Sequence, residues 1–280
     1  MDITGQNALH KIIKGHAWMD YVEPTYWNGK FDNSVDKYLK VSLCTTVMDR
    51  LYDLKRTLPK NIEDNSDYPN MEYVILDYNS QDDLEGWVKS EMANFIEDGI
   101  VVYVRTEEPT YYSMTHSRNI AFKVASGDIV NNVDADSYTN EGFATYLNML
   151  AHQQPEKAIF GKGRKMLRGR LGFYRKEFIE LLAGYDEDLK GYGHDDHDIM
   201  HRAWGLGFSL MWFGGQYYTP VDDHRKHQGK NYQHASWRYT EKRNKVLSFF
   251  NIAAGKFKAN EGHHWGKATL IKNFTEEVRI

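Results

Sequence analysis

The sequence predicts an α/β protein with a mainly parallel central sheet that is flanked by helices. The chain has 280 residues, enough for one full α/β domain with a buried core. Strand-like apolar runs alternate four times with polar or amphipathic helix-like runs between residues 41 and 136, as a sheet of parallel strands requires. Polar side chains gather directly after these strands, which is where ligands bind in such sheets.

The first strand–helix unit shows the pattern most clearly. We expect a strand at KVSLCTTV, residues 40–47, and a helix at residues 49–64. Leu51, Leu54 and Leu58 recur there at helical spacing, so the helix has one apolar face.

The later units repeat this alternation. MEYVILDY, residues 71–78, is a short apolar run typical of a buried parallel strand. Further strands are expected at 100–106 and 128–136, and helices at 85–98 and 113–126. After residue 140 we expect another helix, then a strand within LRGRLGFYR and a helix at KEFIELLAG.

No clear linker divides the chain, so we expect one main domain with short flanking segments. The expected segments are an extension at 1–40, the main domain at 41–250 with a nucleotide-binding half at 41–138 and an acceptor and catalytic half at 139–250, and a tail at 251–280.

Composition excludes several classes of protein. The net charge is −4 and no basic block dominates, which argues against a nucleic-acid partner. The longest apolar runs are short, so we expect no transmembrane segment, and no signal-peptide core opens the sequence. The single cysteine, Cys44, suits a reducing compartment. We therefore expect a cytoplasmic protein, with transient association at the inner face of the membrane as an option. The 19 tyrosines and seven tryptophans suit either a sugar-binding cleft or an ordinary core.

Two acids follow the fourth expected strand. Asp134 and Asp136 are hard oxygen ligands of the kind that Mg²⁺ or Mn²⁺ prefers, and such an ion can hold a diphosphate. The alternative is a turn held by Asx hydrogen bonds. Their position at a strand end favours the ligand interpretation.

The surrounding stretch resembles a known signature. SRNIAFKVASGD followed by IVNNVDADSYTNEGF is similar to the central motifs of inverting GT-A glycosyltransferases of the family 2 type, although Ala121 stands where glycine is usual. The likeness extends from about Val41 to His227 and implies the GT-A (Rossmann-like) fold. It also implies a Mn²⁺ or Mg²⁺ cofactor with Asp136 as a ligand, and Asp134 at the donor ribose or in the metal shell. Arg118, in the matching Arg-Asn pair, is then a donor-binding residue.

Other donor-side matches are partial. The family's second strand often ends in two acids and a serine, and ILDYNSQDD keeps Asp77 as a base contact but has Tyr78 in place of the second acid. Tyr78 is then a candidate for stacking on the base. Arg50 stands where related β-1,4-galactosyltransferases carry a diphosphate-binding arginine; the alternative is a solvated arginine in the first turn of a helix. Thr46, at the end of the first strand, completes the expected donor site.

The stretch GYGHDDHD resembles the Gly-Trp-Gly-Gly-Glu-Asp-Asp-Asp segment of the β-1,4-galactosyltransferase-like group. The resemblance implies that Asp196 is the general base, and that Asp195 and Tyr192 bind the acceptor. His194 replaces a glycine of that segment and His197 replaces an aspartate. A helix start enriched in acids would explain some of these residues but not the glycines.

A third metal ligand is expected in the polar loop at 214–235. The same resemblance favours His224 by its spacing after the acid pair, with His227 as the second candidate and Asp222 and Asp223 as further options. The length and polarity of the loop are typical of a lid that closes over a nucleotide.

The sequence therefore predicts a metal-dependent inverting glycosyltransferase. Its expected donor is a UDP-sugar, with a galactose-type sugar as one candidate, and its acceptor is a hydroxyl of a saccharide or glycolipid in surface polysaccharide or glycolipid synthesis. One alternative is a sugar nucleotidylyltransferase, but TTVMDRLYD lacks the glycine-rich basic loop that such an enzyme needs. The other is a non-catalytic carbohydrate-binding protein, which needs neither the acid pair nor the metal motif.

Overall fold

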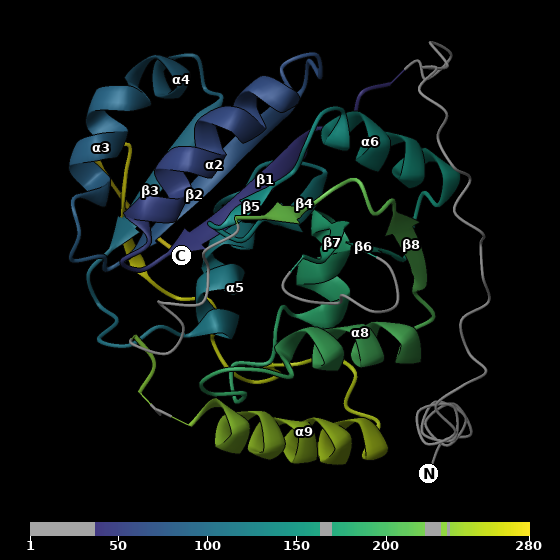
Figure 1. Ribbon diagram of the computed structural model, residues 1–280. Helices are drawn as coiled ribbons and strands as arrows, with labels where there is room; N and C mark the ends of the chain where they lie inside the picture. Colours follow the sequence, from purple (N-terminus) through teal and green to yellow (C-terminus); the bar gives the residue numbers. More distant parts are fainter. Residues whose placement is uncertain (1–36, 163–169, 222–230, 234–235) are drawn as a thin grey trace.

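A large mixed sheet with helices on both faces organises the chain (Figure 1). The computed structural model describes residues 37–162, 170–221, 231–233 and 236–280. Within these ranges the sheet has nine strands in the order β11-β10-β3-β2-β1-β4-β7-β6-β8. The predicted α/β class, with a mainly parallel centre flanked by helices, is confirmed.

The first half of the chain builds the parallel centre, where β1 pairs with both β2 and β4, and β2 pairs with β3. Its strands are β1 (Val41–Val47), β2 (Met71–Tyr78), β3 (Val101–Thr106) and β4 (Ile129–Asn132). Its helices are α2 (Leu51–Asp64), α3 (Leu84–Glu91), α4 (Ala93–Glu97) and α5 (Met114–Val124). The single helix expected at 85–98 is divided in two at Met92, where the backbone leaves helical geometry.

Successive side chains of the central strands point alternately into two hydrophobic cores, one on each face of the sheet. In β1, Leu43 packs into the core under α2, whereas Cys44 packs into the core under α5. In β2, Ile75 and Leu76 separate in the same way. Successive side chains of a strand point to opposite faces, so a run that is apolar throughout is buried on both faces.

The second half extends the sheet with antiparallel pairs. β7 pairs with β4 and β6, and β6 continues in parallel with β8. Its strands in this sheet are β6 (Ala158–Lys162), β7 (Gly172–Tyr174) and β8 (Ser209–Phe213). β5 (Ser137–Tyr138) and β9 (Thr219–Pro220) pair antiparallel in a separate two-stranded sheet. The helices of the second half are α6 (Phe143–Gln153), α7 (Arg175–Glu177), the π-helix η1 (Phe178–Leu182), α8 (Asp195–Gly205) and α9 (Trp237–Ala253).

A hairpin near the C-terminus lengthens the other edge of the sheet. β10 (Thr269–Lys272) pairs antiparallel with β3, and β11 (Glu276–Arg279) pairs antiparallel with β10. The sequence pattern does not predict these strands. The expected division of the chain at residues 40, 138 and 250 stays a prediction. No helix of the described ranges is long and apolar enough to cross a membrane.

Candidate functional site

The turn after β4 presents two carboxylates at the carboxyl end of the sheet. Its backbone is held by α2, since Thr57 Oγ1 donates to the Ala135 carbonyl at 2.7 Å and Asn61 Nδ2 donates to the Ser137 carbonyl at 3.1 Å. The carboxylates remain partly open to solvent, with 33% of the Asp134 side chain and 19% of the Asp136 side chain exposed. The turn therefore offers two anionic groups beside each other at a fixed place.

Arginines surround these two acids. Arg50, which directly precedes α2, donates from Nη2 to Asp136 Oδ2 at 3.0 Å. Asp134 lies 3.9 Å from Arg118 Nη2 and 3.7 Å from Arg170 Nε. Burial raises the pKa of Asp134, and the two arginines offset only part of that rise. The strand end thus combines carboxylates for a cation with guanidinium groups for an anion.

Arg118, on α5, also joins this strand end to the acidic start of α8. Its Nη1 donates to Asp195 Oδ2 and, at 3.0 Å, to Asp196 Oδ1. The side chain is buried, which alone would lower the pKa of Arg118, but Asp196 and Asp195 raise that pKa well above its usual value. The arginine therefore stays charged, and Asp134 lies on one side of it with the acid pair on the other.

The glycines before the acid pair have a structural reason. Gly191 and Gly193 adopt φ of 76° and 94°, a region that disfavours other residues. A Cβ on Gly191 would lie 2.6 Å from Thr240 Cγ2 of α9. His194 adopts φ of 72°, and the resembling segment has a glycine at that position. The likeness of the turn to that segment stays a prediction.

A row of tyrosines connects the predicted donor and acceptor sides. Tyr78, at the end of β2, meets Tyr112 edge-on at 5.7 Å between ring centroids. Tyr112 meets Tyr232 at 5.6 Å, and Tyr232 meets Tyr192 at 5.8 Å. Thr46 Oγ1 and the Tyr112 hydroxyl are hydrogen-bonded at 2.5 Å. The row thus brings Thr46, Tyr78 and Tyr192 into one connected structure.

Asp77 and Tyr78 are more deeply buried than a simple donor-contact role requires. One Asp77 oxygen accepts a hydrogen bond from the Ser80 amide at 2.8 Å, and the other accepts from Tyr103 Oη at 2.7 Å and Arg105 Nη1 at 2.5 Å. The Tyr78 ring is only 2% exposed. Their donor-binding roles stay predictions, and in this conformation their polar partners lie within the protein.

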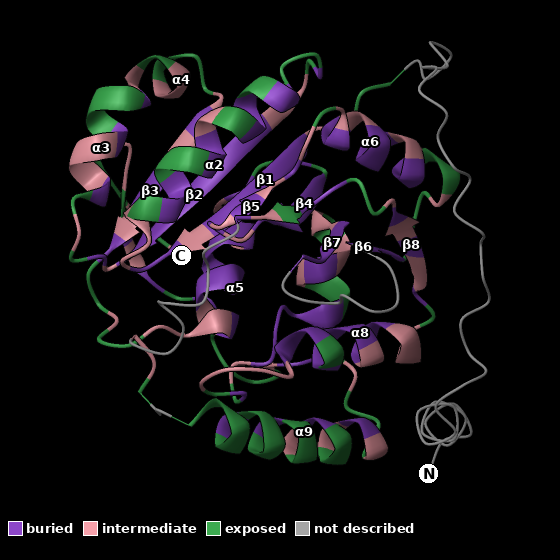
Figure 2. Cartoon of the chain, viewed as in Figure 1, coloured by how far each residue is buried: buried purple, intermediate pink, exposed green. Residues whose placement is uncertain are grey.

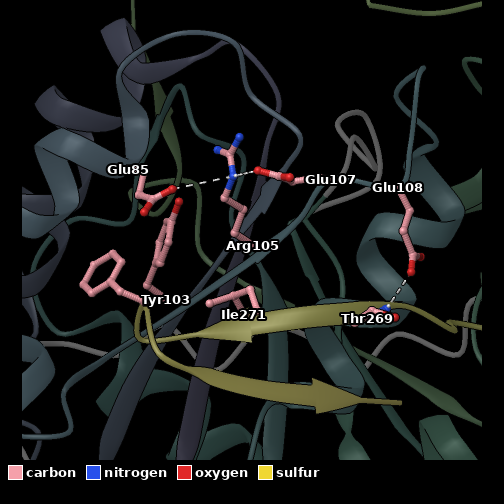
Figure 3. Close-up of a pocket in the computed structure, with 8 residues that line it drawn as sticks. Glu85, Tyr103, Arg105, Glu107, Glu108, Thr269 and Ile271 are labelled. Carbon is pink, nitrogen blue, oxygen red and sulfur yellow. Dashed lines mark hydrogen bonds and ion pairs between the residues drawn. The ribbon is translucent and has the colours of Figure 1, made fainter.

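A cavity of about 610 Å³ opens beside the carboxyl end of β3 (Figure 3). Its lining residues are Glu85, Tyr103, Arg105, Glu107, Glu108, Thr269, Ile271 and Phe274. Arg105 Nε lies 3.6 Å from Glu85 Oε2 and 3.3 Å from Glu107 Oε1, so the guanidinium lies between two carboxylates. Because Arg105 also binds Asp77, this cavity adjoins the donor side, whereas it is not lined by Asp134 or Asp196.

All candidates for the third metal ligand lie outside the described residues. They are His224, which the resemblance favours, and His227, Asp222 and Asp223. Across the part of the chain that the structure describes, no group of three or more histidine, cysteine or acidic side chains is arranged to hold a metal ion. Asp134 and Asp136 have carboxylate oxygens of the kind that suits a hard divalent cation, and their role as metal ligands stays a prediction.

The histidines near the acid pair form a separate cluster along α8. His194 and His197 are stacked at 5.4 Å between ring centroids, and His201 lies 6.4 Å from each of them. Burial lowers the pKa of His194 and of His201 to about 4, with a further lowering from the neighbouring histidines. Both rings are therefore neutral at pH 7.

Arg170 and Tyr232 are two site residues that sequence reasoning misses. Besides approaching Asp134, Arg170 donates from Nη2 to Ser137 Oγ at 3.1 Å, although it belongs to the segment before β7. Tyr232 lies between Tyr112 and Tyr192 although it belongs to the polar loop at 214–235. Neither residue belongs to a local motif, so only the folded arrangement identifies it.

Comparisons with known proteins concern the family and the fold of the chain. The family model described as Glycosyl transferase family 2 matches residues 42–212. Among curated protein sequences the chain has no match.

Solved structures with a similar fold include three that are described in complex with a nucleotide or a nucleotide sugar. S. aureus TarS 1-349 in complex with UDP is 16% identical with a TM-score of 0.55, and the match covers 65% of this chain and 60% of that chain. Mannosyltransferase PcManGT from Pyrobaculum calidifontis in complex with GDP-Man and Mn²⁺ is 19% identical with a TM-score of 0.58, covering 91% and 73%. GalNAc-T7 with UDP, GalNAc and Mn²⁺ is 16% identical with a TM-score of 0.57, covering 76% and 48%. At these identities the likeness concerns the fold.

Proposed function

The chain belongs to glycosyl transferase family 2, and we propose that it transfers a sugar from a nucleoside diphosphate donor to a saccharide hydroxyl with inversion. The observation that best supports this proposal is the position of Arg118. Its guanidinium lies within 3.9 Å of Asp134 and 3.0 Å of Asp196, so the predicted donor and acceptor acids adjoin one charged group. A direct displacement needs both sets of acids around one reacting carbon.

We expect the donor to be a UDP-sugar and the cofactor to be Mn²⁺ or Mg²⁺. TarS 1-349 and GalNAc-T7 are described with UDP, and PcManGT with GDP-Man, so GDP-mannose is the second donor to test. Asp136 and Asp134 would hold the ion, with His224 as the third ligand. When bound, the ion would offset the charge that develops on the departing diphosphate.

Arginines around the strand end would bind the same diphosphate. Arg50 lies beside Asp136 and can turn its guanidinium from that carboxylate to a phosphate oxygen. Burial and its two acidic partners, Asp136 and Asp53, act in opposite directions on the pKa of Arg50, and the net change is a rise. The arginine is therefore a permanent cation that can stabilise a leaving group.

On the acceptor side, Asp196 would take the proton of the attacking hydroxyl as its oxygen bonds to the sugar. General-base catalysis of this kind contributes about 10²–10⁴-fold to the rate. Arg118 donates to Asp196 Oδ1 and would orient the carboxylate. Asp195 would hold a second acceptor hydroxyl, and Tyr192 would pack beside the acceptor sugar. The likeness of GYGHDDHD to the β-1,4-galactosyltransferase-like segment supports these roles and makes galactose one candidate sugar.

We place the reaction in surface polysaccharide or glycolipid synthesis, with a saccharide or glycolipid as acceptor and a cytoplasmic location at the inner face of the membrane. The support is the predicted use of a nucleotide sugar and the single cysteine, Cys44, which is buried and free.

A donor-hydrolysis screen tests the proposal. The protein is incubated with Mn²⁺ and each of several UDP-sugars and GDP-mannose, and release of the nucleoside diphosphate is measured without an acceptor. We expect slow release from one donor, and loss of that release after Mn²⁺ is chelated. If no donor releases its nucleoside diphosphate, the proposal is contradicted. Release of pyrophosphate from UTP and a sugar 1-phosphate would instead support a nucleotidylyltransferase.

A further inference from the structure

Helix α9 attaches to the protein through a polar stripe. Its buried positions recur every four residues, at Thr240, Asn244, Ser248 and Ile252. Three of these four side chains are polar, and two of them bind backbone groups: Thr240 Oγ1 donates to the Tyr192 carbonyl and Asn244 Nδ2 donates to the Gly193 carbonyl, each at 2.9 Å. A surface helix of a globular protein usually buries its apolar side chains instead.

The outer face of α9 carries the apolar side chains that such a helix would normally bury. Phe250 is 71% exposed, Tyr239 61% and Val246 55%, and they follow one another at spacings of seven and four residues. These spacings put them on one stripe of the helix. Trp237, half-exposed, begins the helix. Figures 1 and 2 show α9 at the outer edge of the molecule, beyond α8.

The same segment is strongly basic. Residues 236–258 contain one acid, Glu241, in a chain whose net charge is −4. The basic residues of this segment are Arg238, Lys242, Arg243, Lys245, Lys256 and Lys258. All six have exposed positions. The exposed side of α9 and the segment that follows it therefore combine aromatic side chains with concentrated positive charge.

We infer that the outer face of α9 binds the surface of an anionic lipid bilayer, with the helix lying in the plane of that surface. Aromatic side chains bury in the headgroup boundary, and lysines flanking them extend to the lipid phosphates. Each basic residue near such a surface adds to the attraction. A protein partner fits less well, because protein interfaces are depleted in lysine.

The helix is also joined to the predicted acceptor side. Thr240 Oγ1 donates to the Tyr192 carbonyl at 2.9 Å, and Asn244 Nδ2 donates to the Lys190 carbonyl at 3.1 Å as well as to Gly193. A bilayer against α9 would therefore lie close to the turn that leads to Asp195 and Asp196. This consequence rests on the proposed function: it makes a lipid-linked saccharide the acceptor class to which the turn has access.

Vesicle co-sedimentation of the full chain tests the inference. Vesicles of phosphatidylcholine with phosphatidylglycerol are compared with vesicles of phosphatidylcholine alone. We expect binding to the anionic vesicles, and a decrease on the order of tenfold in the partition coefficient for Phe250→Ser, because a large apolar side chain no longer enters the boundary. Lys242→Glu should lower binding to the anionic vesicles by a similar factor.

Matched controls come from α2. Tyr52 is an exposed aromatic residue with Lys55 over its ring at 5.7 Å, so Tyr52→Ser and Lys55→Glu repeat both changes on another helix. They should bind vesicles as the unchanged protein does.

The inference is overturned if the unchanged protein does not bind anionic vesicles or if Phe250→Ser binds them equally well. It is also overturned if light scattering shows a dimer that Phe250→Ser dissociates, which would identify a second copy of the chain as the partner. Vesicle binding uses no donor, so its failure leaves donor hydrolysis, and with it the proposed function, to be judged separately.

Discussion

Arg118 Nη1 lies 3.0 Å from Asp196 Oδ1, and the guanidinium of this buried arginine also approaches Asp134 to within 3.9 Å. Two acidic groups that are 62 residues apart in the sequence therefore adjoin one cation. Without it, the buried carboxylates of Asp195 and Asp196 would repel each other. Arg118 thus has a structural role that accompanies its proposed role at the donor.

Replacing Arg118 should destabilise the fold. Arg118→Met leaves Asp195 and Asp196 without their shared cation, and breaking a buried ion pair from one side costs about 3–5 kcal/mol. Urea denaturation measures the change in the free energy of unfolding. Arg279 pairs with Glu277 at an exposed position, so Arg279→Met should cost less than about 1 kcal/mol. Equal losses in the two variants would show that Arg118 does not hold the acid pair.

Asp136→Ala should remove the metal dependence of nucleotide binding, because one of the two proposed oxygen ligands is lost. Calorimetry of UDP binding with and without Mn²⁺ gives the ratio of affinities, which should fall to about one. Asp53 binds Arg50 as Asp136 does but belongs to α2. Asp53→Asn is therefore the control, and its ratio should match that of the unchanged protein. If the ratio of UDP affinities with and without Mn²⁺ is unaltered in Asp136→Ala, Asp136 is not a metal ligand.

Stability should fall in mild acid through the histidines of α8. The pKa values of His194 and His201 are lowered to about 4 by burial, whereas an unfolded histidine has a pKa of about 6.5. Between these values the unfolded chain binds protons that the folded chain does not, so the free energy of unfolding decreases as the pH falls. From pH 7 to pH 5 each histidine should contribute a loss of roughly 1–2 kcal/mol.

Denaturation of His201→Gln at both pH values measures this effect, and its loss on acidification should be smaller than that of the unchanged protein. His263 is exposed, so His263→Gln should leave the loss unaltered. If His201→Gln loses as much stability in acid as the unchanged protein, His201 is not a source of the pH dependence.

The central sheet was predictable because its strands carry their own signal. β2 is a mainly apolar run, and β1 combines apolar residues with small hydroxyl residues, which is the composition expected of strands that are buried on both faces. The hairpin of β10 and β11 lacks such a run. Ile271 is exposed, and the pairing of Lys272 with Val104 joins segments far apart in the sequence. Local patterns contain no information about a pairing of that kind.

The site was predictable to the extent that its residues lie in short motifs. Asp134 and Asp136 are two residues apart, Asp195 and Asp196 are adjacent, and both pairs lie at element ends, so pattern and resemblance make them candidates. Arg170 reaches the site from a different segment, and no spacing relates it to Asp134. Gly191 illustrates the opposite case. A glycine at this position suggested a functional motif. Its positive φ and the closeness of Thr240, which leaves no room for a Cβ, are sufficient structural reasons for a glycine there.

The most direct test of the proposed chemistry is the kinetics of Asp196→Asn with the donor identified by the hydrolysis screen. The account predicts donor affinity like that of the unchanged protein, together with a fall in kcat of about 10²–10⁴-fold, because the amide cannot accept the hydroxyl proton. Asp186→Asn, at another buried acid in the segment before α8, is a control that should retain most of the activity. A near-normal kcat for Asp196→Asn with intact donor binding would contradict the account and assign the base to another residue.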